Sequence, residues 1–259
     1  MAPISNGYFN LIMNLKISFH FIYYATVALA GYRFWFLPFL ALLWIIFQYF
    51  LWIYNGEKLI SLVTIQHTFI GIPLTAIGIF FGVRIIAGEI DDRSLEIAFT
   101  IPGGSERLWL AKLFSAFLIL LFTTVSLSLL ICTIFKPFPL GMIYGVLQDA
   151  CFYMILAMAM GAFFRNTSTG VIGILPILGL NMFLTDFGEN QIRFLPFFNP
   201  HVLLDSTSSS TTIDGGFTSP KELLAWTIQN RIFMALLITF TLLLAFMRAN
   251  KRETMLDGI

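Results

Sequence analysis

Residues 108–135 read LWLAKLFSAFLILLFTTVSLSLLICTIF. The only charged side chain in this stretch is Lys112, close to its start, and most of the others are apolar. A helix that crosses a bilayer needs about 20 mainly apolar residues. The stretch is therefore long enough to span a membrane, and it predicts a chain built from membrane-spanning helices.

The composition of the whole chain agrees with this prediction. Of the 259 residues, 58% are hydrophobic, 16% aromatic and 11% charged, and the net charge is +1. A soluble domain is about 45–50% apolar and about 25% charged, so this chain has too few charges to cover a soluble surface. The small net charge also argues against a nucleic-acid partner, which needs an excess of basic residues. A cytosolic enzyme and a disordered protein are excluded, and an all-α polytopic membrane helix bundle remains.

Six stretches are predicted to cross the membrane within a single transmembrane domain covering residues 1–259. They are residues 34–54, 62–83, 108–135, 140–164, 168–185 and 232–247. Residues 186–231 form the longest polar stretch and are predicted to be extracellular. Within them, residues 219–222 resemble a capping box with Pro220 at the first helical position, which predicts a helix running into the last span.

The N-terminal residues 8–31 are apolar, but polar side chains recur one helical turn apart at Asn6, Asn10, Asn14 and Ser18. This pattern predicts an amphipathic helix lying at the membrane interface. A seventh span over residues 17–31 is the alternative. With six spans and the N-terminus inside, ten Lys and Arg residues fall on inner segments and five on outer ones. This bias places both termini in the cytoplasm.

Charges are densest in the predicted cytoplasmic segment 84–107, between the second and third spans. Its first part is predicted to be one amphipathic helix, with Ile90 and Leu95 on an apolar face. The charged face carries Glu89, Asp92, Arg93 and Glu96, and Glu89 and Arg93 have the spacing of a favourable exposed pair. Pro102 and the two glycines after it end this helix. Ser105 is then a predicted N-cap for the next helix, with Glu106 in its first turn.

This segment resembles the signature region of the ABC-2 type family of ABC transporter permeases. The matching residues, in order and spacing, are Glu89, Leu95, Glu96, Pro102 and Lys112. Arg93 and Ser94 stand where the family has a Gly-Thr-like pair, which is a departure from the pattern. The resemblance extends to the layout of the chain, with an N-terminal amphipathic helix, six spans and a short basic tail.

The resemblance implies that residues 84–107 hold a coupling helix that docks on an ABC ATPase subunit. Coupling would fall on Glu89, Asp92, Arg93, Leu95, Glu96, Pro102 and Glu106. The chain lacks a G-x-x-x-x-G-K-[S/T] phosphate loop, so ATP and Mg would bind to the partner ATPase, and this chain is expected to bind no cofactor itself. The family also implies a dimer with a second copy or a paralogous permease, export, and a prokaryotic inner membrane.

A few other residues are candidates for a pathway or for helix packing. Asp149 is an acid inside the fourth span, which is functional by default because charge is costly there; a paired acid facing the bundle is the alternative. Gly141 and Gly145 form a G-x-x-x-G motif that permits close helix approach, and Pro176 interrupts the fifth span. Residues 192–200 either re-enter the membrane or pack over the bundle.

No cluster of residues points to an enzyme or a metal site. The three histidines, His20, His67 and His201, are far apart and lack metal-ligand spacing. A stand-alone channel or secondary transporter is the alternative function. It predicts transport by this chain alone, and Asp149 is the residue that would favour it.

Overall fold

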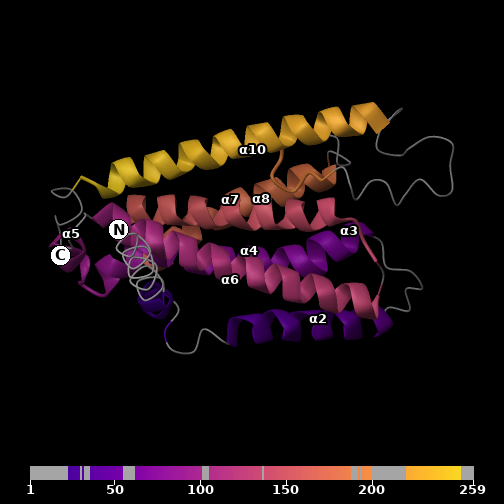
Figure 1. Cartoon of the computed structure of the whole chain (residues 1–259), viewed down its shortest axis with the longest axis horizontal. Coiled ribbons are helices and arrows are strands. Elements are labelled where there is room, and N and C mark those ends of the chain that lie inside the picture. The colour runs from indigo at the N-terminus through magenta and orange to yellow at the C-terminus, as the bar shows by residue number, and fades with distance from the viewer. Residues whose placement is uncertain are drawn as a thin grey trace, which may run out of the picture.

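Most of the residues that the structure describes are helical (Figure 1). The computed structural model describes residues 23–29, 31, 36–54, 62–100, 105–135, 137–187, 192, 194–199 and 220–251. Within these residues there is no strand. The all-α class is confirmed for this part of the chain. The predicted interfacial helix over residues 8–31 lies mostly outside the described residues.

In the part of the chain that the structure describes, nine helical elements follow the short helical stretch at residues 23–29. They are α2 (Phe36–Tyr54), α3 (Leu62–Thr64), the π-helix η1 (Ile65–Gly71), α4 (Ile72–Asp91), α5 (Leu95–Thr100), α6 (Ser105–Ile134), α7 (Leu140–Phe164), α8 (Thr167–Phe187) and α10 (Pro220–Ala249). Five stretches are long and apolar enough to cross a membrane: Leu62–Asp91, Ser105–Ile134, Leu140–Phe164, Thr167–Thr185 and Leu224–Ala249. Within α2, Phe39–Tyr54 is a shorter apolar helix.

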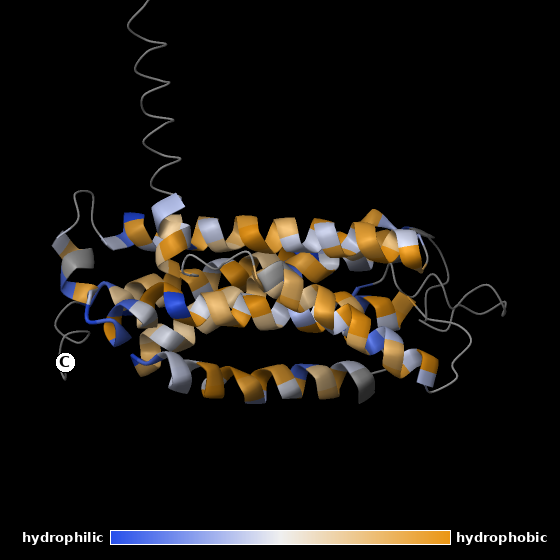
Figure 2. Ribbon diagram, turned by 90° about the horizontal axis from the view of Figure 1, so that it is seen from below, coloured by the Kyte–Doolittle hydropathy of each residue, from blue (hydrophilic) through white to orange (hydrophobic). Residues whose placement is uncertain are grey.

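The long helices of the bundle consist mainly of hydrophobic residues, as the colouring in Figure 2 shows. Large apolar side chains such as Phe122, Leu129, Ile172 and Leu236 are more than half exposed. A soluble monomer rarely exposes wide apolar patches, whereas lipid tails cover such a surface without cost. The integral membrane character is therefore supported by the surface as well as by the composition.

The helices α4 and α7 form the centre of the bundle and run parallel to each other. Small residues bring their backbones together: a Cβ on Gly78 would meet the Ala150 carbonyl, and one on Gly82 would overlap the Met154 carbonyl. Gly78 and Gly82 form a G-x-x-x-G motif, which permits this kind of approach. Near the end of α7, Gly161 is packed in turn against α4 and against α8. The motif at Gly78 and Gly82 was not predicted from the sequence, whereas the one at Gly141 and Gly145 was.

The two ends of the bundle differ in composition. One end, here called the charged end, is where α4, α7 and α10 finish and where α6 and α8 begin; α5 also lies there (Figure 1). The other end is called the opposite end. The helices α4, α7 and α10 run toward the charged end, and α6 and α8 run away from it.

Two helices extend beyond the predicted spans. The helix α4 continues unbroken past residue 83 to Asp91 and includes the first part of the predicted coupling segment. The helix α10 begins at Pro220, within the predicted extracellular segment 186–231. The predicted helix start near residue 220 is thereby confirmed. Arg231, which was counted as an outer charge, lies against α7 within the bundle.

A π-helical turn precedes Pro73 in the second span. Proline has no N–H to donate to the preceding turn, and here the Ile72 N–H bonds to the His67 carbonyl, five residues back. The Thr68 carbonyl accepts a hydrogen bond from the Trp44 indole Nε1 of α2, at 2.7 Å. Because Pro73 has no N–H, a carbonyl of the preceding turn accepts a hydrogen bond from a side chain of the neighbouring helix α2 instead.

Candidate functional site

The candidate site is the connection between α4 and α5 at the charged end, residues 89–95, which we call the elbow. The backbone N–H of Ser94 bonds to the Glu89 carbonyl at 2.9 Å, and that of Arg93 to the Ile90 carbonyl at 3.0 Å. Arg93 is left-handed, with φ 55°. These bonds make a Schellman motif, in which a left-handed residue ends a helix. Glycine usually holds that position, and an arginine there is uncommon.

The single amphipathic helix predicted across the elbow is therefore wrong. The Schellman motif splits it into the end of α4 and the separate, six-residue α5. The predicted Glu89–Arg93 surface pair is wrong for the same reason, since Arg93 lies outside the helix. No glycine stands at the left-handed position where α4 ends, so the local sequence did not indicate that the helix stops there.

Glu89 is buried rather than exposed. Its carboxylate forms a salt bridge with the Lys112 ammonium of α6, and the side chains of this pair are 11% and 4% exposed. The Ser94 hydroxyl also donates a hydrogen bond to the Glu89 carboxylate. Removing one partner of a buried ion pair costs about 3–5 kcal/mol, because the other charge stays buried and uncompensated. Glu89 therefore joins the elbow to α6.

Leu95 anchors α5 to the core, because its side chain is fully buried. Phe99 of α5 packs edge-on against Trp109 of α6, with ring centroids 6.1 Å apart. Trp109 is itself fully buried and stacks on Phe246 of α10 at 6.2 Å. A continuous chain of apolar contacts thus runs from α5 through α6 to α10.

The remaining predicted coupling residues present charge to solvent. Asp92, Arg93, Glu96 and Glu106 are exposed. The Glu106 carboxylate accepts a hydrogen bond from Asn250, just beyond the end of α10. Pro102 lies outside the described residues. Of the predicted set, then, Glu89 and Leu95 are internal anchors, while the four exposed residues form a surface.

Asp91 was not predicted, yet it connects the elbow to a further span. It is the last residue of α4, and its Oδ2 accepts hydrogen bonds from Thr167 at the start of α8, 3.1 Å from the backbone nitrogen and 2.6 Å from Oγ1. The two residues are separated by 76 positions. Only the folded arrangement could reveal this contact.

Asp149 lies in a second polar cluster, between α7 and α10, which we call the α7–α10 cluster: Tyr144, Gln148, Asp149 and Arg231. Gln148 and Asp149 are buried, Arg231 is half-buried and Tyr144 is exposed. Arg231 donates to the Gln148 Oε1 at 3.0 Å, and its guanidinium lies 4.6 Å from the centre of the Tyr144 ring. Asp149 is 4% exposed and lies in the field of Arg231, but it forms no salt bridge with it. Its Oδ1 has no hydrogen-bond partner among the described residues.

The other two predicted packing sites lie on α7 and α8. The Asn199 side chain lies beside Gly145, its Nδ2 lies 3.5 Å from the Gly141 carbonyl, and the Arg231 side chain of α10 also lies close to Gly145. Asn199 ends the non-helical residues 194–199, and Phe197 in the same segment packs on Tyr153, halfway along α7. The helix α8 continues through Pro176, whose side chain is exposed.

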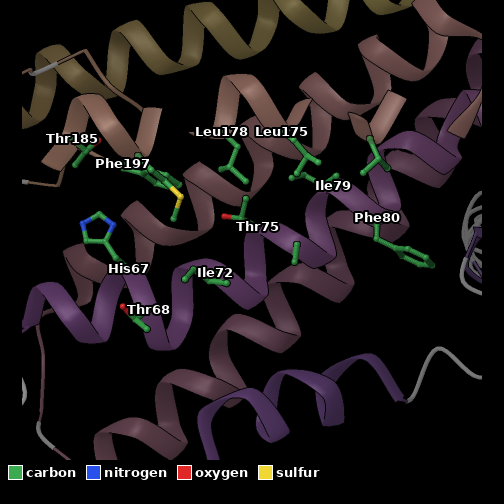
Figure 3. A pocket seen from close by; sticks show the side chains of 13 residues that line it. His67, Thr68, Ile72, Thr75, Ile79, Phe80, Leu175, Leu178, Thr185 and Phe197 are labelled. Atoms are coloured by element: carbon green, nitrogen blue, oxygen red, sulfur yellow. The ribbon is translucent and has the colours of Figure 1, made fainter. Parts of the chain in front are cut away.

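A cleft of about 660 Å³ separates η1 and α4 from α8 (Figure 3). His67 and Thr185 lie on opposite walls toward one end of it, Thr75 lies near its middle, and Phe80 lies at the other end. The lining is otherwise mainly apolar: Ile72, Ala76, Ile79, Val171, Leu175, Leu178, Met182 and Phe197, with Thr68. Such a surface suits an apolar or amphipathic molecule, with only a small number of hydroxyl and imidazole groups among the lining residues.

Among the described residues, no three His, Cys, Asp or Glu side chains come together as metal ligands. The chain matches no known family model, no curated protein and no solved structure.

Proposed function

We propose that this chain is the membrane-spanning permease subunit of an ATP-driven ABC transporter of the ABC-2 type, working as an exporter with a separate ATPase subunit. The observation that carries the proposal is the elbow. It presents exposed charges beyond the membrane-length helices, yet it is held to α6 by Glu89 and to the core by Leu95. A soluble partner that moved α5 would thereby move the spans.

The distribution of positive charge supports a cytoplasmic location for the charged end. Of the described Lys and Arg residues, those in the half of the bundle next to this end are Arg84, Arg93, Arg107, Lys112, Arg165, Arg248 and Lys251, while Lys221 and Arg231 lie in the other half. Positive residues are retained on the cytoplasmic side of membranes. In this proposal α2 is the first of six spans, and both termini lie in the cytoplasm.

The mechanical step follows from the contacts of α5. When two ATPase subunits close on ATP, they would draw together the α5 helices docked on them. Phe99 would carry this displacement to Trp109 and on to Phe246, while the Glu89–Lys112 salt bridge keeps α4 and α6 moving together. Packed cores transmit such shifts because they are not easily compressed.

The cleft between α4 and α8 supplies a wall for cargo in this proposal. A second copy, or a paralogous permease, would supply the other wall of a pathway between the two chains. The few polar groups in the cleft, among them Thr75 and Thr185, favour an apolar or amphipathic cargo over a strongly charged one. Active transport of a strongly charged small solute by the purified complex would contradict this assignment.

The proposal is tested by co-expressing the chain with ABC ATPase subunits of the same genome and measuring ATP hydrolysis by the purified complex in liposomes. We expect one of them to bind stably and its hydrolysis to be stimulated. Glu96→Arg should weaken the stimulation without reducing membrane insertion, because Glu96 is exposed on α5. Lys221→Glu, a charge reversal at the opposite end, is the matched control and should have no effect. Full stimulation with Glu96→Arg would show that α5 is not the docking element.

The α7–α10 cluster favours a second candidate function, a stand-alone channel or secondary transporter. Asp149 is a buried acid with an unpartnered oxygen among the described residues, and intramembrane acids serve ion and proton pathways. This alternative predicts transport by the purified chain without any ATPase, driven by an ion gradient and lost in Asp149→Asn. The ABC proposal predicts no such transport.

A further inference from the structure

Asp91 occupies an unfavourable position in its own helix. It is the last residue of α4, where the helix dipole presents partial negative charge and disfavours a carboxylate. A compensating partner is therefore expected close by. That partner is the first turn of α8, where the dipole of the second helix presents partial positive charge to the same carboxylate.

The geometry of the contact is that of a helix cap supplied by another helix. The first N–H groups of any helix lack partners within it. In α8, the Asn166 Oδ1 accepts from the Thr169 N–H at 3.1 Å and serves as the local cap. Asp91 takes the Thr167 N–H and hydroxyl, and its Oδ1 lies 3.4 Å from the Asn166 Nδ2. A hydrogen bond to a charged acceptor is stronger than a neutral one.

This contact lies beside a cleft whose lining comes from both α4 and α8. The cleft has a volume of about 340 Å³ and is lined among others by Arg84, Asp92 and Ser168. Further along, the larger cleft of about 660 Å³ separates the same two helices. Asp91 is therefore the polar link between the elbow and the helix that forms one wall of that larger cleft.

We propose that Asp91 is a positioning residue that links the elbow to α8, so that a displacement of α5 changes the width of the cleft between α4 and α8. The proposal rests on the proposed function, since it names how the docking movement reaches the cleft. It assigns α8 a connection of its own, separate from the contacts of α5 with α6 and α10.

The link itself is tested on the full chain in detergent, without any ATPase. Hydrogen exchange at the amides of the first turn of α8 should become about five-fold faster in Asp91→Ala, the usual effect of losing a helix cap. Thr167→Val should give a smaller increase, because it removes the hydroxyl donor but keeps the N–H. Thr167→Ser keeps both donors, so the exchange should stay as slow as in the unaltered chain. Ser168→Ala, at the neighbouring exposed residue, is the control and should match the unaltered chain.

The positioning role is tested on the complex with its ATPase in liposomes, by the amount of cargo moved for each ATP hydrolysed. Asp91→Ala should keep the affinity for the ATPase and should lower the transport per ATP about five-fold, in step with the loss of the cap. Thr167→Ser should retain the ratio, and Thr167→Val should lower it partly. A change in ATPase affinity of the same size as the change in transport would instead make Asp91 a docking residue and overturn the proposal.

The remaining outcomes are also decisive. Unchanged exchange in Asp91→Ala would show that the link does not hold α8. Faster exchange with an unchanged transport ratio would reduce Asp91 to a cap and overturn its positioning role. If the unaltered chain stimulates no ATPase, the proposed function fails and the coupling role of Asp91 fails with it, whereas the exchange result still decides whether the link exists.

Discussion

The elbow and the α7–α10 cluster both bury charged side chains between helices, but they satisfy those charges differently. In the elbow, Glu89 meets Lys112 in a salt bridge and receives a further hydrogen bond from Ser94. In the α7–α10 cluster, Arg231 bonds to Gln148 while Asp149 keeps an unpartnered oxygen among the described residues. A fully paired cluster fixes the relative positions of its helices, whereas an incompletely paired one leaves them freer to change. The elbow is therefore expected to hold α4 and α6 together more firmly than the α7–α10 cluster holds α7 and α10.

The largest expected effect is at the elbow. Glu89→Gln or Lys112→Met should lower the free energy of unfolding by about 3–5 kcal/mol, because each leaves one buried charge unpaired. The measurement is denaturant or thermal unfolding of the purified chain in detergent. The double variant Glu89→Gln, Lys112→Met should recover most of the loss, since no charge then remains buried. Additive losses in the double variant would contradict the assignment of a direct pair.

The next effect concerns the segment that packs beside the α7–α10 cluster. Gly145→Ala should destabilise the chain by about 1–3 kcal/mol, the usual cost of overpacking, because a Cβ there would overlap the Asn199 side chain. Gly179→Ala is the matched control, because a Cβ at Gly179 meets open space. Proteolysis within residues 194–199 should also become faster in Gly145→Ala. Equal stability of the two alanine variants would show that Asn199 does not occupy the place beside Gly145.

A smaller effect is expected where α2 meets the π-helix. Trp44→Phe keeps the aromatic bulk and removes the hydrogen bond to the Thr68 carbonyl. Side-chain hydrogen bonds between membrane helices contribute about 0.6 kcal/mol on average, so the loss should be of that size. Trp52→Phe, also in α2, is the matched substitution and should cost less, because the Trp52 Nε1 has no hydrogen-bond partner among the described residues. Equal losses in the two variants would contradict a special role for Trp44.

The smallest effect is expected in the α7–α10 cluster, and it tests the difference between the two clusters most directly. Asp149→Asn should change the free energy of unfolding by less than about 1 kcal/mol, because the acid forms no salt bridge whose loss would strand a partner. The same unfolding measurement on Glu89→Gln allows the changes in the free energy of unfolding of the two variants to be compared directly. If Asp149→Asn costs as much as Glu89→Gln, the two clusters are equally rigid and the distinction between them fails.

Much of the helical layout could be predicted from apolar runs. The fourth predicted span, residues 140–164, coincides with α7, and the others agree within a few residues except where a helix extends into a polar stretch. Those exceptions share a cause. Residues 84–91 and 220–231 carry more charge than the apolar runs, but they lie on helices that continue past the apolar stretch. Of their charged side chains, Glu89 is buried, Arg84 and Arg231 are half-buried, and Asp91, Lys221 and Glu222 are exposed.

The candidate site was predicted as a segment but not as a structure. The charge density of residues 84–107 and the resemblance singled out this segment, yet Glu89 was assigned to the surface, whereas it is buried. An i, i+4 spacing suggested Arg93 as its partner, because spacing along a helix is all that a sequence displays. The Schellman motif at Arg93 removed that partner, and the actual one lies 23 residues away on α6.

By itself the sequence determined that this protein is helical and buried in a membrane, because long apolar runs with few charges must satisfy their backbone hydrogen bonds internally in lipid. It also determined where the charges gather. Only the tertiary structure decided what those charges do. Whether Glu89 meets Lys112, Asp91 caps α8, or Asp149 remains unpaired depends on how closely Gly78 and Gly82 let α4 approach α7 and on the neighbours placed around that pair. Such contacts join residues far apart in the chain, and local spacing carries no record of them.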